Sequence, residues 1–158
     1  MGMKLLIAGI GNILMRDEGI GVYQAMSFSK KKIEGVRIIE VGTETWKIFP
    51  EAENFENLLI IDAVKFGNYP GTVYFIKNFE ISSLPYFSLH QKDFIKEIFL
   101  IKELKGKPRN VYLFGIEPES IGWGIGLSES LERKFEQIQE KLERVCFMIL
   151  KGAENVIY

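Results

Sequence analysis

Apolar residues form several short continuous runs along the chain, each bounded by glycine, proline or charged residues. The runs at 3–9 and 57–63 are apolar almost throughout, which is typical of strands buried on both faces of a parallel sheet. The pattern predicts five strands in all, at 3–9, 36–41, 57–63 and 72–76, and from 109 to the segment that leads into Pro118.

Between these runs the apolar residues recur at helical spacing. The segment 17–31 has this spacing and ends in three lysines, and a wide apolar face predicts a further helix at 93–104. After Ser128, a predicted N-cap, four-three spacing indicates an amphipathic terminal helix. The segment 44–55 is predicted to be a short helix or an irregular crossover interrupted by Pro50.

Strands and helices therefore alternate along the whole chain. This order favours an α/β fold, namely a three-layer αβα domain whose mostly parallel, twisted, five-stranded sheet is flanked by helices. The sequence contains no repeat, linker or low-complexity tract. We expect residues 1–158 to form one domain.

Composition excludes several classes of function. With 20 basic and 21 acidic residues the net charge is -1, so the chain lacks the basic surface that nucleic acids require. The apolar run at 5–10 is far shorter than the roughly 20 residues of a membrane span, and we expect no membrane partner. Cys146 is the only cysteine, which excludes an internal disulfide and favours a cytoplasmic location. Its apolar neighbours predict a buried, inert thiol.

The stretch GIGNILMRDEGIG, residues 9–21, follows the first predicted strand, where open α/β folds bind ligands. Its glycines do not complete the GxGxxG pattern of dinucleotide sites, because Leu14 stands at the third position. The chain also has no Gly-Lys-Ser or Gly-Lys-Thr of a phosphate loop. The sequence therefore predicts no nucleotide cofactor.

Asp17 and Glu18, within this stretch, allow two interpretations. Asp17 suits a helix N-cap, and Glu18 suits the positive end of the helix dipole. Alternatively, Glu18 projects into the crevice at the carboxyl ends of the strands. Asp62 favours the second interpretation, because it also ends an apolar strand, where a buried carboxylate needs a partner. The alternative for Asp62 is a structural role, in which its carboxylate caps the following loop by hydrogen bonds.

His90 is the only histidine and lies in the segment 78–90, which is predicted to be a loop. By itself it could be an ordinary packing residue. Together, Glu18, Asp62 and His90 would supply two carboxylates and one imidazole, a donor set suited to a borderline divalent metal such as nickel or zinc.

Several ordered motifs give the chain a resemblance to a known family. GIGNILMRDEGIG, IIDAV, YPGT, LHQ, and IEPES with the later GLS resemble, in this order, the motifs of the hydrogenase maturation proteases. The resemblance extends over nearly the whole chain. It implies an endopeptidase that removes the C-terminal extension of the large-subunit precursor of a nickel-iron hydrogenase.

The resemblance also implies roles for individual residues. Glu18, Asp62 and His90 match the family's nickel-recognising residues, and the nickel belongs to the substrate rather than to the enzyme. Zinc or cadmium is expected to substitute for it in vitro. The partner would be the nickel-loaded precursor, which the enzyme inspects before cutting.

Sequence motifs of the common protease classes are missing. The chain has no HExxH, no GxSxG and no second aspartate to pair with Asp62. Within the residue set that the resemblance implies, the two carboxylates Glu18 and Asp62 are the candidate catalytic residues. Either the metal polarises a water or the substrate carbonyl, or the metal only docks the substrate while a carboxylate activates water. The competing hypotheses are a non-catalytic module that binds a nucleotide, or an assembly chaperone for the hydrogenase.

One segment departs from the family pattern. After the second strand the family usually has an aspartate followed by Gly-Gly-Thr, whereas this chain has Glu40, Val41, Gly42 and Thr43. Either a different hydrogenase partner or local repacking would explain the change. In another loop, GWGIG, Trp123 is a candidate interface anchor, because tryptophan often anchors interfaces and loops often carry function.

Overall fold

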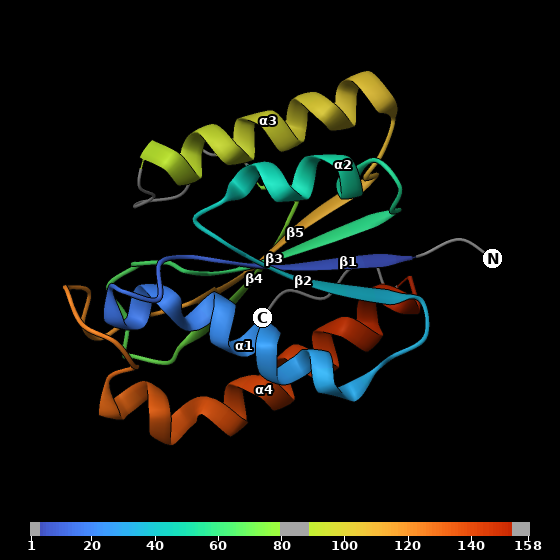
Figure 1. Ribbon diagram of the computed structural model, residues 1–158. Coiled ribbons are helices and arrows are strands. Elements are labelled where there is room, and N and C mark those ends of the chain that lie inside the picture. The colour runs from blue at the N-terminus through green and yellow to red at the C-terminus, as the bar shows by residue number, and fades with distance from the viewer. Residues whose placement is uncertain (1–3, 80–88, 153–158) are drawn as a thin grey trace.

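The computed structural model describes residues 4–79 and 89–152. Within these residues five strands form a sheet in the order β2-β1-β3-β5-β4 (Figure 1). The strands are β1 (Leu5–Ile10), β2 (Val36–Gly42), β3 (Asn57–Ala63), β4 (Val73–Lys77) and β5 (Asn110–Ile116).

The sheet is mixed but mostly parallel. Strands β1, β2, β3 and β5 run parallel, and β4 pairs antiparallel with β5 at one edge. Every residue of β1 is buried, and so are all residues of β3 and β5 after the first. The continuous apolar runs in the sequence are explained by this burial on both faces, and the predicted α/β fold is confirmed.

Helices cover both faces of the sheet. Figure 1 shows α1 and α4 on one face and α2 and α3 on the other. The α-helices are α1 (Ile20–Phe28), α2 (Phe49–Ala52), α3 (Leu89–Lys105) and α4 (Glu129–Leu150), and short 3-10 helices are η1 (Arg16–Gly19), η2 (Ser29–Lys31) and η3 (Thr45–Ile48). No helix in the described segments is long and apolar enough to cross a membrane.

Two helix predictions need correction. The segment 17–31 is not one helix, because the 3-10 turn η1 precedes α1 and a second one, η2, follows it. The backbone of His90 belongs to the first turn of α3 and not to a loop. The apolar repeat that reveals this helix begins at Phe94, one turn later, so the sequence pattern hides the start. Residues 80–88 of the predicted loop lie outside the described residues.

Each face of the sheet has its own apolar core. On one face, α1 and α4 contribute Phe28, Leu131 and Leu142, and on the other α3 contributes Phe94 and Ile98. Ser128 caps α4 as predicted, since its hydroxyl accepts a hydrogen bond from the N–H of Leu131 at 3.4 Å.

Cys146 lies within the core between α4 and the sheet, as predicted. Burial, with a smaller contribution from the charge of Glu143, raises the pKa of its thiol to about 11. Because the thiolate is the reactive form of cysteine, this residue is unsuited to nucleophilic catalysis.

Gly21 lets α1 begin directly above the ends of β1 and β3. A Cβ atom at this residue would lie 2.2 Å from the carbonyl oxygen of Ile61 and 2.5 Å from that of Ile10. No side chain fits in that space. The glycine therefore allows the turn that precedes α1 to lie close to the carboxyl end of β3.

Replacement of Gly21 by alanine tests this contact. Because the new methyl group would overlap backbone atoms of both strands, Gly21→Ala should lower the free energy of unfolding by about 1–3 kcal/mol. Gly122→Ala is the matched control, since no atom lies within 4 Å of its added Cβ. Urea unfolding measures both changes, and equal effects would contradict the close approach.

Candidate functional site

The sheet changes its direction of winding at β1. The chain leaves β1 through α1 to β2 on one side, and then crosses to β3 on the other side of β1. Connections that diverge in this way leave a crevice at the carboxyl ends of the two strands, where open α/β sheets bind ligands. The loop after β1 carries Glu18, and Asp62 is the penultimate residue of β3.

Gly11 separates the backbone of Glu18 from the side chain of Asp62. A Cβ at Gly11 would lie 2.0 Å from the carbonyl oxygen of Glu18 and 3.6 Å from Oδ1 of Asp62. Gly11 also has a φ of 127°, which L side chains rarely adopt. The structure thus brings Glu18 and Asp62 together around a residue that has to be glycine.

Burial dominates the electrostatics of Asp62. Its side chain is 0% exposed, and this burial raises its pKa well above the usual aspartate value. The N–H of Ala63 donates to Oδ1 at 2.8 Å and lowers the pKa, whereas the nearby charge of Glu18 raises it. Partial burial also raises the pKa of Glu18. Both carboxyl groups therefore hold protons more strongly than exposed carboxyl groups do.

Two such carboxyl groups can act in two ways. A divalent cation would compensate both negative charges and would replace the protons that they otherwise retain. A carboxylate of raised pKa is also a better general base near neutral pH than an ordinary one. The pair thus suits either cation recognition or activation of water.

His90 is known only by its backbone, because its side chain lies outside what the structure describes. The 17 residues of α3 make a helix of about 25 Å, comparable with the length of a strand of this sheet. Since α3 ends shortly before β5 begins, its first turn lies at the carboxyl end of the sheet (Figure 1). Among the described side chains, no group of three potential ligands could hold a metal ion.

Asp17 does not cap a helix, so that interpretation is wrong. Neither η1 nor α1 has a side-chain cap, and the carboxylate of Asp17 is 0% exposed. It accepts hydrogen bonds from residues 119, 120 and 128 of the loop between β5 and α4. These donors lie more than one hundred residues away, which local capping rules cannot reveal.

Glu117 is a buried acid that the sequence interpretation did not single out. It follows β5 directly, at the carboxyl end of the sheet where Asp62 also lies. Its carboxylate accepts hydrogen bonds from the N–H groups of Phe66 and Asn68 and from the hydroxyl of Tyr74. Burial, followed by the hydrogen bond to Glu117 as the second cause, raises the pKa of Tyr74 to about 12. The available signal was its position at the end of a strand, which it shares with Asp62.

We call residues 117–128 the distal loop. It lies beside the turn that carries Glu18, and Met15 and Gly124 form an isolated parallel bridge between the two segments. Four large apolar side chains on these segments are exposed, namely Ile13 (43%), Leu14 (49%), Trp123 (79%) and Ile125 (79%). An exposed apolar group next to a crevice is typical of a protein-binding surface.

Glu40 and Val41, the two residues that differ from the family pattern after the second strand, lie in different surroundings. The register between β1 and β2 shifts so that Val41 is an extra residue of β2, and its side chain is buried in the core. The burial of Val41 favours local repacking over a change in partner contact at this position. Glu40 is exposed and lines the groove along Gly11, Asn12 and Thr43.

Comparison with known proteins identifies the family. The sequence profile described as Hydrogenase maturation protease (HycI) matches residues 21–145, a span that includes Asp62 and His90 and begins just after Glu18. The chain belongs to the hydrogenase maturation protease family. Members of this family process the C-terminus of the hydrogenase large subunit, and the chain is an endopeptidase of this kind.

Relatives agree with this assignment along most of the protease. It is 30% identical to the Hydrogenase 2 maturation protease of Escherichia coli K12 over 89% of this chain and 88% of that protein. It is 29% identical to the hydrogenase expression/formation protein HupD of Bradyrhizobium diazoefficiens, over 97% of this chain and 81% of that one.

Solved structures agree as well. The protease matches the hydrogenase maturating endopeptidase HybD of E. coli with a TM-score of 0.80 and 29% identity, covering 95% of this chain and 94% of that one. The NiFe hydrogenase maturation protease HybD of Thermococcus kodakarensis gives a TM-score of 0.75 at 26% identity, covering 90% and 99%. A purely non-catalytic module is therefore not the interpretation that these relatives support.

The protonation of Asp62 makes the stability of the protease depend on pH. Because its pKa is raised on folding, the folded state binds the proton more strongly than the unfolded chain. Stability should therefore fall as pH rises from the ordinary aspartate pKa, near 4, to the raised value. Asp62→Asn should remove this loss and raise the free energy of unfolding at neutral pH by about 1–2 kcal/mol.

Asp17→Asn is the matched control, since it changes an equally buried aspartate whose carboxylate is surrounded by hydrogen-bond donors. It should lower stability at the same pH. Thermal unfolding of the three proteins across pH measures both effects. A less stable Asp62→Asn protein with the wild-type pH dependence would contradict the burial account.

Proposed function

We propose that this protease removes the C-terminal extension of a nickel-loaded NiFe hydrogenase large-subunit precursor, and that Glu18, Asp62 and His90 recognise the nickel. The nickel is part of the substrate. The observation that carries the proposal is the approach of Glu18 and Asp62 around Gly11, at the carboxyl ends of β1 and β3. Membership of the family supports it.

The electrostatics of the pair support a cation as the recognised feature. Two carboxyl groups that resist ionisation alone become ionised readily beside a divalent cation. Two oxygens and the imidazole of His90 would form a mixed donor set that suits nickel and also accepts zinc or cadmium. These residues leave coordination positions for the ligands that the precursor provides.

The cut itself has two possible chemical routes in this site. The nickel polarises a water or the scissile carbonyl, or a carboxylate of the pair takes a proton from the attacking water. Both routes need the nickel and the scissile bond to lie in the same crevice. Nickel recognition would thus make the protease a checkpoint that cuts only metal-loaded precursor.

Neutral replacements of the two acids test this proposal. Glu18→Gln and Asp62→Asn keep the size of each side chain but remove the charge, and each should slow processing of the nickel-loaded precursor by about 100-fold or more. The mass of the precursor's C-terminus reports cleavage, and a parallel binding assay with nickel-loaded and nickel-free precursor reports recognition.

Glu53→Gln serves as the control, because it makes the same chemical change at an exposed position in the turn after α2. Full processing and undiminished nickel-dependent binding by Asp62→Asn would remove Asp62 from the site. Binding of the precursor by the wild-type protein without any cleavage would favour the chaperone hypothesis.

The exposed apolar side chains beside the crevice are expected to contact the precursor. Trp123→Ala should raise KM for the precursor about 10-fold, the size of a moderate interface hot spot, with little change in kcat. Leu104→Ala is the control, since it removes a 72% exposed apolar side chain from the last turn of α3, at the end of that helix away from the carboxyl ends of the strands. Equal KM values for the wild type and both variants would exclude Trp123 from the contact.

A further inference from the structure

The carboxylate of Asp17 is a junction between two segments far apart in the sequence. Its Oδ2 accepts from the N–H of Glu119 and of Ser120, each at 2.9 Å, and from the hydroxyl of Ser128 at 2.7 Å. Its Oδ1 accepts from the N–H of Ser128 at 2.7 Å. Both oxygens are thus bound by donors of the distal loop. Such hydrogen bonds to a charged acceptor are short and strong.

Backbone hydrogen bonds join the same two segments. The N–H of Asp17 donates to the carbonyl of Ser120 at 3.1 Å, and the N–H of Arg16 donates to the carbonyl of Gly124 at 3.0 Å. In return, the N–H of Gly124 donates to the carbonyl of Leu14 at 2.9 Å. The turn that precedes Glu18 and the distal loop therefore form one connected unit.

On its other side, the same turn packs against Gly11. The backbone carbonyl of Glu18 lies against Gly11, where even a methyl group would overlap it. The turn is therefore enclosed by Gly11 on one side and the distal loop on the other. Of these two contacts, only the one with the distal loop depends on a side-chain charge, that of Asp17.

We propose that Asp17 is a positioning residue: it ties the distal loop to the turn of Glu18 and so fixes the Glu18 carboxylate relative to Asp62 for binding of the metal. The inference rests on the proposed nickel recognition. It gives a buried acid next to Glu18 a role that helix capping does not explain. The hydroxyl of Ser128 takes part, because it donates to Asp17 while it accepts from Leu131 at the start of α4.

Asp17→Asn and Ser128→Ala test this role. An asparagine amide nitrogen cannot accept a hydrogen bond, so at least one donor of the distal loop would lose its partner. Ser128→Ala removes the hydroxyl that donates to Asp17 and accepts from Leu131, but it retains the Asp17 carboxylate and its three backbone donors. It provides a milder variant should Asp17→Asn fold poorly. Ser128→Thr keeps the hydroxyl and should restore wild-type behaviour.

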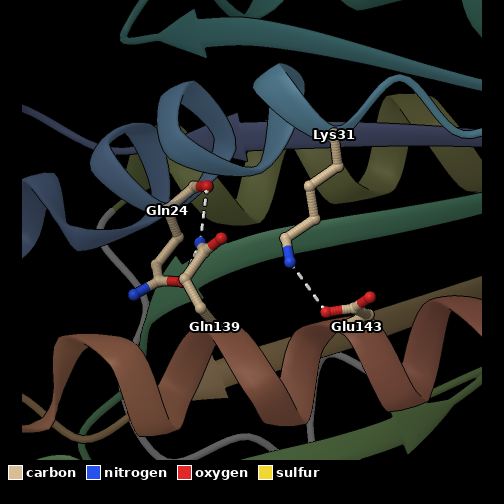
Figure 2. Close-up of polar contacts among 4 residues, drawn as sticks. All are labelled: Gln24, Lys31, Gln139 and Glu143. Carbon is tan, nitrogen blue, oxygen red and sulfur yellow. Dashed lines mark hydrogen bonds and ion pairs between the residues drawn. The ribbon is translucent and has the colours of Figure 1, made fainter.

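Gln139→Ala is the control for simple loss of stability. Figure 2 shows Gln139 of α4 facing Gln24 of α1, where its amide donates to the carbonyl of Gln24 at 3.0 Å and to its Oε1 at 2.5 Å. Like Ser128, Gln139 joins α4 to the amino-terminal part of the chain by buried hydrogen bonds. It does so through α1 itself and not through the turn of Glu18.

Three measurements are made on each protein at a temperature where all are folded. They are the melting temperature, the affinity for Cd²⁺ by calorimetry, and KM and kcat for the nickel-loaded precursor. Asp17→Asn should weaken Cd²⁺ binding by about 10–100-fold, as is usual when a group that orients a metal ligand is lost. KM should rise more than kcat falls, and Ser128→Ala should show a smaller change of the same kind.

Gln139→Ala should lower the melting temperature while its Cd²⁺ affinity and KM stay at wild-type values. Equal melting losses in Asp17→Asn and Gln139→Ala, with wild-type Cd²⁺ affinity and KM in both, would overturn the positioning role. Cd²⁺ binding by a wild-type protein that leaves the precursor uncut would instead contradict the proposed function alone. A wild-type protein that binds no Cd²⁺ would contradict both.

Discussion

A carboxylate shielded from water carries a large energetic cost, and Asp62 stands in such a position at the end of a central strand. The nearby charge of Glu18 increases the cost of ionising it. Proteins retain such groups where function benefits from their raised pKa. In this protease a cation brought by the substrate would relieve the cost, so that recognition of the metal and ionisation of the pair are one event.

The fold supplies this arrangement through close backbone contacts. Gly21 allows α1 to begin against β1 and β3, and Gly11 leaves room between the Glu18 turn and Asp62. Asp17 then attaches the distal loop to the same turn. The exposed Trp123 of that loop lies near the crevice for the same reason. The carboxyl pair and an exposed apolar surface are thereby held close together, as the proposed recognition of a nickel-loaded protein substrate would require.

Sequence alone predicts the layers and the sheet well, because burial on both faces of β1, β3 and β5 leaves apolar runs that are easily recognised. The placement of Asp62 at the carboxyl end of the sheet also follows from the sequence, because it ends such a run, and Glu18 belongs to the glycine-bounded turn that follows another. The role of Asp17 does not, because its partners are distant in the chain and are mostly backbone N–H groups. The start of α3 at Leu89 was missed because its first turn precedes the apolar repeat.

Anomalous diffraction from crystals of the protease soaked with Cd²⁺ or Ni²⁺ tests the central claim most directly. The account predicts one strong metal peak in the crevice between β1 and β3, coordinated by oxygens of both Glu18 and Asp62. It also predicts that this peak disappears in Asp62→Asn crystals. Metal bound only elsewhere, or a peak in the crevice that persists unchanged without the Asp62 charge, would contradict the claim.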